Sequence, residues 1–205
     1  MPGFSRPLLA ALVVGSLLAG CSGGGDEDAG SPQKATPETT TTKAPARVAV
    51  MGTKVEAMAP QAPAFPAEVQ SAVQATLDAY LAKGVVRPLE TGEPATGLEP
   101  VFTEAALARL AGPGPDRSAV LEEGEPLRGT VRPDRANATL TALTAPGGEV
   151  VLVTAQLDLA HTVEADDRAV AVVRSGEVVL IPYGGWRIDA YDMRTARDTQ
   201  PPGPR

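Results

Sequence analysis

The spacing of hydrophobic residues in this chain changes from a helical to an alternating pattern near its middle. Apolar side chains recur at helical spacing after Pro66, at Val69, Val73, Leu77, Tyr80 and Leu81. Proline is favoured in the first turn of a helix and glycine at its end. The pattern therefore predicts a helix from Pro66 to Gly84.

A second helix is predicted over Glu104–Ala111. Thr103 is a favourable N-cap residue, and Gly112-Pro113 ends the pattern. Phe102 and Leu107 stand where a hydrophobic staple would fix the start of this helix. A helical layer thus precedes the alternating half of the chain.

The remaining half predicts a short helix followed by a sheet. The short helix covers Asp116–Glu123 and ends at Gly124. Apolar and polar residues then alternate in six segments separated by turn-forming residues: Leu127–Arg132, Ala138–Ala145, Glu149–Val163, Arg168–Arg174, Glu177–Pro182 and Trp186–Met193. Short connections favour antiparallel neighbours. We expect an α+β domain in which N-terminal helices pack on one antiparallel sheet of about six strands.

The last predicted strand carries a resemblance to a known superfamily. Gly184-Gly185-Trp186-Arg187-Ile188-Asp189-Ala190-Tyr191-Asp192 is similar to the closing strand of nuclear-transport-factor-2-like, or cystatin-like cone, domains. The resemblance implies a curved, cone-like sheet whose mouth is closed by the helices. Secreted actinomycete-type lipoproteins carry similar domains. The superfamily includes dehydratases, isomerases, cyclases and non-catalytic modules, so the fold alone implies no activity.

The N-terminal residues have the pattern of an export signal. Arg6 precedes the apolar run Leu8–Leu18, which is shorter than the ~20 residues of a membrane-spanning helix. Leu18-Ala19-Gly20-Cys21 resembles the bacterial lipobox, in which a cysteine after the cleavage site receives a diacylglycerol thioether. Residues 1–20 are therefore predicted to be a lipoprotein signal peptide and Cys21 to be lipidated. The alternative is an ordinary secretory signal followed by a free thiol.

The stretch after Cys21 predicts a tether. Ser22–Ala46 contains no Val, Ile, Leu, Met or aromatic residue, so it cannot bury enough apolar area to fold. We expect residues 21–64 to tether a single domain, residues 65–198, to the extracytoplasmic side of the cell membrane. Residues 199–205 are predicted to form a disordered tail. Within the tether Arg47–Ala64 is intermediate, because its valines favour a short edge strand and its prolines an irregular chain.

Composition excludes several classes of partner and site. The formal net charge of −7 and the sequence pI of 4.8 argue against nucleic acid as a partner. Cys21 is the only cysteine and His161 the only histidine, which excludes disulfides within the chain and metal sites built from several cysteines or histidines. The acidic residues around Asp166 lack the spacing of a calcium-binding loop. No metal or cofactor is predicted.

Asp158 and His161 are the candidate catalytic residues. Both lie on the predicted strand Glu149–Val163, and their separation of three places them on opposite faces unless a bulge intervenes. His161 shares its face with apolar residues, where it would act as a general base inside a cone or lie at the rim beyond the buried part of the strand.

The candidates for a pocket or an interface are aromatic: Trp186, Tyr80 and Tyr191. Alternation places Trp186 on one face of the last strand, where it anchors the core or lines a pocket. It places Tyr191 and Met193 on the other, outer face, which favours a partner or dimer surface there or merely scattered exposed apolar residues.

Three functions are compatible with this pattern. The first is a membrane-anchored lipoprotein with a non-catalytic domain that binds a ligand or a protein. The second is a small hydratase or isomerase acting on an apolar substrate through His161 and Asp158. The third is an accessory subunit that docks on an envelope protein or on a second copy through Tyr191 and Met193. The expected partners are thus the membrane through Cys21, an envelope protein or homodimer, and an apolar small molecule.

Overall fold

The computed structural model describes residues 46–57, 64–112, 115–121, 127–165 and 168–200. All of them belong to Lys43–Arg205, the second of two units into which the chain divides. The predicted signal peptide, Cys21 and the run Ser22–Pro45 lie outside the described residues.

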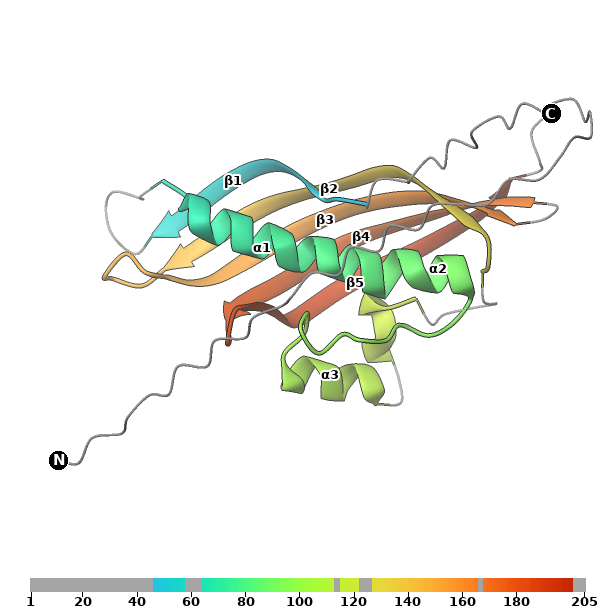
Figure 1. Cartoon of the computed structure of the whole chain (residues 1–205). Coiled ribbons are helices and arrows are strands. Elements are labelled where there is room, and N and C mark those ends of the chain that lie inside the picture. The colour runs from blue at the N-terminus through green and yellow to red at the C-terminus, as the bar shows by residue number, and fades with distance from the viewer. Residues whose placement is uncertain (1–45, 58–63, 113–114, 122–126, 166–167, 201–205) are drawn as a thin grey trace, which may run out of the picture. The chain divides into compact units, whose positions relative to one another are not determined.

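Five strands form one open sheet in the order β1-β2-β3-β4-β5. They are β1 (Ala49–Ala57), β2 (Thr130–Thr144), β3 (Val150–Ala165), β4 (Arg168–Pro182) and β5 (Trp186–Gln200). β1 runs parallel to β2 and the other neighbours are antiparallel. The long strands curve past the helices, which cover one face of the sheet (Figure 1). The predicted α+β class is confirmed.

The prediction of about six strands is wrong because two predicted turns lie inside strands. Pro133-Asp134 forms an irregularity within β2, where the register shifts between Pro133 and Arg135. Ser175-Gly176 lies within β4, and Gly176 pairs with Met193 of β5. A Cβ atom at Gly176 would overlap the Asp192 carbonyl oxygen, so glycine here permits close approach of β5 rather than a turn.

The fold begins earlier than residue 65, because β1 lies within the range predicted as tether. Two side chains of the first helix hold the residue before this strand. The backbone N–H of Val48 donates to Asp78 Oδ1 at 2.7 Å, and Gln74 Nε2 donates to the Val48 carbonyl at 2.9 Å. Tertiary hydrogen bonds and pairing with β2 thus decide what the local sequence left open. At the other end β5 continues through Thr199 and Gln200, which were predicted to belong to the tail.

The first helix does not stop at Gly84. α1 (Ala67–Tyr80) continues through a π-helical turn, Leu81–Val86, into α2 (Arg87–Thr91). A Cβ atom at Gly84 would lie 3.1 Å from the Tyr80 ring, so this glycine provides room for the ring. The stop is Gly92, which caps α2 in the left-handed conformation with φ 72°.

α3 (Glu104–Ala111) begins as predicted. The Thr103 side chain accepts a hydrogen bond from the Ala106 backbone N–H at 3.2 Å, which confirms it as the N-cap. Where the sequence predicted a helix over Asp116–Glu123, the described residues form the short 3-10 helix η2 (Pro115–Ala119). Gly124 lies outside the described residues.

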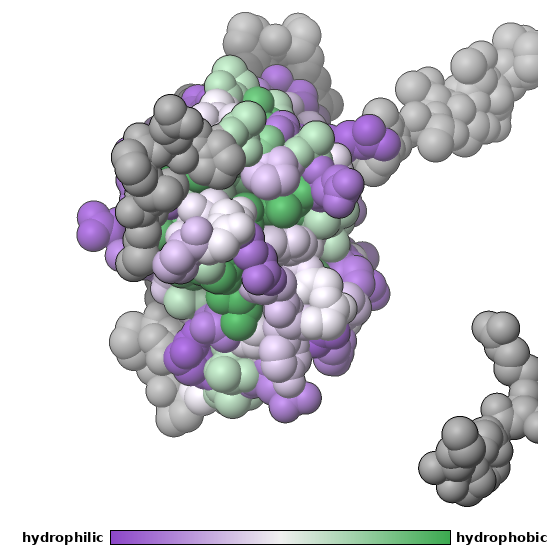
Figure 2. Space-filling view, turned by 90° about the vertical axis from the view of Figure 1, so that its left-hand side faces the viewer, coloured by the Kyte–Doolittle hydropathy of each residue, from purple (hydrophilic) through white to green (hydrophobic). Residues whose placement is uncertain are grey.

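The core lies between the helices and the inner face of the sheet. Every second residue of β3 from Val153 to Val163 points inward and is buried. The opposite face carries an exposed polar row formed by Thr139, Gln156, Glu177 and Asp192. Seen from the end of the sheet that holds the β2–β3 and β4–β5 turns, hydrophobic residues are interspersed with polar ones (Figure 2).

Candidate ligand-binding site

A charged side chain lies in this core. Arg174 is fully buried, with 0% of its surface exposed. It occupies an inward position of β4 in line with Val172 and Val178. On the neighbouring strands it pairs with Leu159 of β3 and Thr195 of β5. Arginine is almost never fully buried unless it is paired, so its contacts need an explanation.

Arg174 and Tyr80 together hold the C-terminal end of η2. Arg174 Nη2 donates to the Ser118 carbonyl at 2.6 Å, and the Tyr80 hydroxyl donates to the Ala119 carbonyl at 2.7 Å. Carbonyl groups at a helix end have no partner within the helix and carry partial negative charge. The contacts therefore satisfy two carbonyls and fasten η2 over β4 and β5.

The guanidinium of Arg174 has more donors than η2 uses. Its Nε and Nη1 atoms are buried without a hydrogen-bond partner. Among the described residues no carboxylate forms an ion pair with it. A buried charge without a counterion costs several kcal/mol (about 3–5). Buried donors without an acceptor are rare in folded proteins and call for an explanation, such as a bound water or ion.

Tyr80 serves as a neutral donor beside this cation. Burial raises the pKa of its hydroxyl, and the positive charge of Arg174 lowers that pKa in part. The hydroxyl therefore keeps its proton at neutral pH and remains bonded to Ala119.

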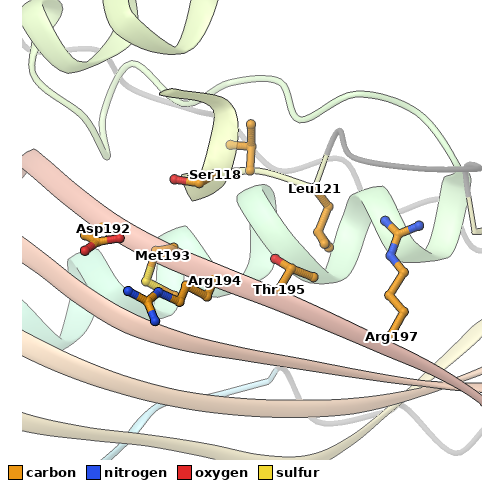
Figure 3. Close-up of a pocket in the computed structure, with 8 residues that line it drawn as sticks. Ser118, Leu121, Asp192, Met193, Arg194, Thr195 and Arg197 are labelled. Atoms are coloured by element: carbon orange, nitrogen blue, oxygen red, sulfur yellow. The ribbon is translucent and has the colours of Figure 1, made fainter. Parts of the chain in front are cut away.

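A groove of about 400 Å³ lies between η2 and β5, next to Arg174. Ser118 and Leu121 lie on one side, and Met193, Thr195 and Arg197 of β5 lie on the other (Figure 3). Val120, Asp192 and Arg194 complete the lining. This volume lies within the range of small-molecule sites, about 300–1,000 Å³. Ser118 connects groove and cation, because it lines the groove and its carbonyl accepts from Arg174.

The lining of the groove combines apolar side chains with hydroxyls and charged groups. Val120, Leu121 and Met193 are the apolar lining residues, and Val120 and Met193 are buried. Ser118 and Thr195 contribute hydroxyl groups. Arg197 is half-buried and lies two residues after Thr195, the residue of β5 that pairs with Arg174. Such a lining fits a ligand that has both an apolar and a polar part.

His161 and Asp158 lie on opposite faces of β3, as their spacing predicted. His161 is buried on the inner face with 1% exposure, so it does not lie at an exposed rim. Asp158 lies on the outer face and forms an ion pair with Arg135 at 2.6 Å, which raises the pKa of that exposed guanidinium. The two candidates therefore do not meet in one catalytic site.

The aromatic candidates fall in different places. Tyr80 belongs to the site beside Arg174. Trp186 is half-buried at the start of β5, where its carbonyl accepts from Thr76 Oγ1 at 2.8 Å. Tyr191 packs against the core, with its ring 6.2 Å from that of Phe102.

The prediction that Tyr191 and Met193 face outward is wrong. Met193 is 3% exposed and lies on the inner face. A register shift between Val179 and Leu180 inserts an extra residue into β5, and this reverses the alternation along the strand.

The sequence analysis did not identify four residues of the candidate site: Arg174, Ser118, Thr195 and Arg197. The signal for Arg174 was present in the pattern of β4, since residues 170, 172, 178 and 180 are apolar and point inward. Reading Ser175-Gly176 as a turn interrupted that pattern. A continuous strand would have placed a charge at a core position.

Other kinds of site find no support in the part of the chain that is described. No group of three or more His, Cys, Asp or Glu side chains is placed to hold a metal ion there. Within the same residues, no helix has the length and hydrophobicity to span a membrane. Comparison of the whole chain with protein-family models, curated proteins and solved structures finds no match in any of the three.

Proposed function

We propose that this protein is a lipoprotein whose folded domain binds a ligand without catalysing a reaction, on the extracytoplasmic side of the cell membrane. The observation that carries the proposal is Arg174, a fully buried cation with unused donors beneath a groove of ligand size. A binding domain explains why such a costly group stays in the core, because a bound anion would offset its desolvation.

Binding is favoured over catalysis by the placement of the polar groups. Asp158 and His161 occupy opposite faces of β3, so they cannot act together on one substrate. The groove is lined by hydroxyls, arginines and one carboxylate, that of Asp192, and no histidine or second carboxylate among its described lining residues pairs with Asp192 for acid–base work.

The finer fold assignment is also part of the proposal. A curved, cone-like sheet of the nuclear-transport-factor-2-like kind is supported by the helices that precede the four long strands β2 to β5 and by the Gly184-Gly185-Trp186 sequence at the start of β5. In such an arrangement the inner face of the sheet would surround a ligand, which agrees with the position of Arg174.

The anchor follows from the lipobox-like sequence that ends at Cys21. Acylation would hold the domain at the membrane, and a flexible spacer of the length of Ser22–Pro45 reaches about 25–30 Å. The test is the Cys21→Ala variant beside the control Ser22→Ala. We expect intact mass spectrometry to show an acylated Cys21 in the control and its absence in the Cys21 variant. An unmodified Cys21 in the control would refute the anchor.

Ligand binding is tested on the full-length protein extracted gently from its own membrane. Native mass spectrometry should show a small molecule bound to the natural protein and lost from the Arg174→Met variant. Arg135→Met is the matched control, because it makes the same substitution on the exposed outer face of the sheet. Identical spectra for all three proteins would refute a ligand site at Arg174.

A further inference from the structure

We infer that the groove between η2 and β5 binds an organic anion with an apolar tail, whose head group is held by Arg174 and Arg197. This inference rests on the proposed function and adds the chemical class of the ligand.

The charge of the head group follows from the register of the sheet. Arg174 pairs with Thr195 and Val172 pairs with Arg197, so the two arginines are diagonal neighbours on the same inner face. Diagonal neighbours in a sheet lie about 7–8 Å apart. An anion between them would interact with both.

Hydrogen bonding points to the same group. Nε and Nη1 of Arg174 are buried donors without an acceptor, and Ser118 and Thr195 add hydroxyl groups at the groove. The oxygens of a carboxylate or a phosphate accept several hydrogen bonds at once, and bonds from a guanidinium to them are charge-assisted. A neutral or cationic head group would leave the buried charge uncompensated.

The apolar tail follows from the apolar residues of the lining. Val120, Leu121 and Met193 line the groove, and Val120 and Met193 are 4% and 3% exposed. Methionine adapts its shape to irregular apolar ligands. These apolar residues therefore fit a hydrocarbon chain better than a second charge.

Access to Arg174 requires a shift of η2. The guanidinium is covered in the described structure, and Ser118 both lines the groove and accepts a bond from it. An anion that bonds to Nε and Nη1 of Arg174 needs access to a guanidinium that is now fully buried, so η2 is the element that moves when the ligand enters.

The inference is tested by titrating matched probes against the mature acylated protein, which begins at Cys21, in a fixed concentration of nonionic detergent, and binding is read by native mass spectrometry. The probes share a ten-carbon tail and differ in their head group: decanoate, monodecyl phosphate, decanamide and decyltrimethylammonium. Acetate serves as the anion without a tail. We expect both anionic probes to bind at least about tenfold more tightly than the neutral, cationic or tail-free probes. The preference between decanoate and monodecyl phosphate then identifies the head group.

Two variants locate the binding. Arg174→Met should weaken binding of the anionic probes at least about tenfold, and Arg135→Met should leave it unchanged. Arg197→Met, at a half-buried position, should weaken binding of the anionic probes by a similar factor. This variant tests the inference if the Arg174→Met protein does not fold. If neutral and anionic probes bound equally and Leu121→Asp abolished that binding, the anionic head group would be overturned and the proposed ligand site would be kept. Absence of binding by every probe would overturn this inference, and the co-purification experiment above would then decide the proposed function separately.

Discussion

Two short helical segments are fastened to β5, and their polar contacts differ. At the junction of α3 with β5, Thr103 Oγ1 donates to Asp189 Oδ1 at 2.8 Å and accepts from the Ala106 N–H, and Arg109 donates to the Asp189 carbonyl. Where η2 packs on the sheet next to β5, Arg174 of β4 donates to the Ser118 carbonyl and keeps other donors unused.

The two junctions also differ in solvation. Arg109 is exposed, so water can satisfy its remaining donors, whereas Arg174 is fully buried. Holding a helix on a strand therefore does not require a buried charge in this fold. The unused donors of Arg174 at the η2 junction are not needed to attach η2, which agrees with the proposed ligand site. Four substitutions test the difference between the two junctions.

The largest effect is expected at Gly176, two residues from Arg174, where β5 lies close against the backbone of β4. A Cβ atom there would overlap the backbone of Asp192, so β5 must move away from β4. We expect Gly176→Ala to lower the free energy of unfolding by about 3 kcal/mol or more, measured by urea denaturation. Gly147→Ala is the control, because no atom lies within 4 Å of its added Cβ. Equal stability of the two variants would contradict the close approach.

A smaller effect is expected at the α3 junction. Thr103→Ala removes the N-cap and the bond to Asp189, and should cost about 1–2 kcal/mol of unfolding free energy. Thr103→Ser keeps the hydroxyl and should recover most of that loss. If serine were no better than alanine, the junction would depend on the threonine methyl group and not on its hydrogen bonds.

Tyr80→Phe removes the second hydrogen bond that holds η2. At pH 7 the expected cost is about 1 kcal/mol. Since burial raises the pKa of Tyr80 in the folded state, its stabilising contribution is complete below pH about 10, the usual tyrosine value, and declines as the pH rises beyond it. The stability difference between natural protein and variant should therefore shrink above pH 10. A difference that grows with pH would contradict a buried neutral hydroxyl. Tyr183→Phe, which removes an exposed hydroxyl, should leave the stability at pH 7 unchanged.

The fold class was predictable because periodicity reports which side of an element is buried. It gave the start of α3 at Thr103 and the inward position of His161. Strand ends were less predictable, since glycine and proline mark turns, bulges and close approaches alike: Gly176 permits a close approach and Pro133 lies at a bulge.

The site was hidden for a related reason. Arg174 becomes unusual only when β4 is recognised as one strand, and Ser118 joins it through a backbone carbonyl, which no side-chain pattern reveals. The groove also depends on the placement of η2 over β5, which is a tertiary contact between distant parts of the chain.

The smallest change in stability is expected from the substitution of the most deeply buried charge. Arg174→Met removes the bond to Ser118, but it also removes a cation whose burial is costly, and Met fills a similar space with apolar atoms. Replacement of buried ionic groups by apolar ones is often neutral or stabilising, so we expect the free energy of unfolding to change by less than about 1 kcal/mol. A loss of about 3 kcal/mol or more would show that Arg174 is primarily a structural clamp for η2. Unchanged stability together with loss of the ligand would show that Arg174 acts in binding. Thr103 differs in this respect, because its replacement by alanine is expected to weaken the fold.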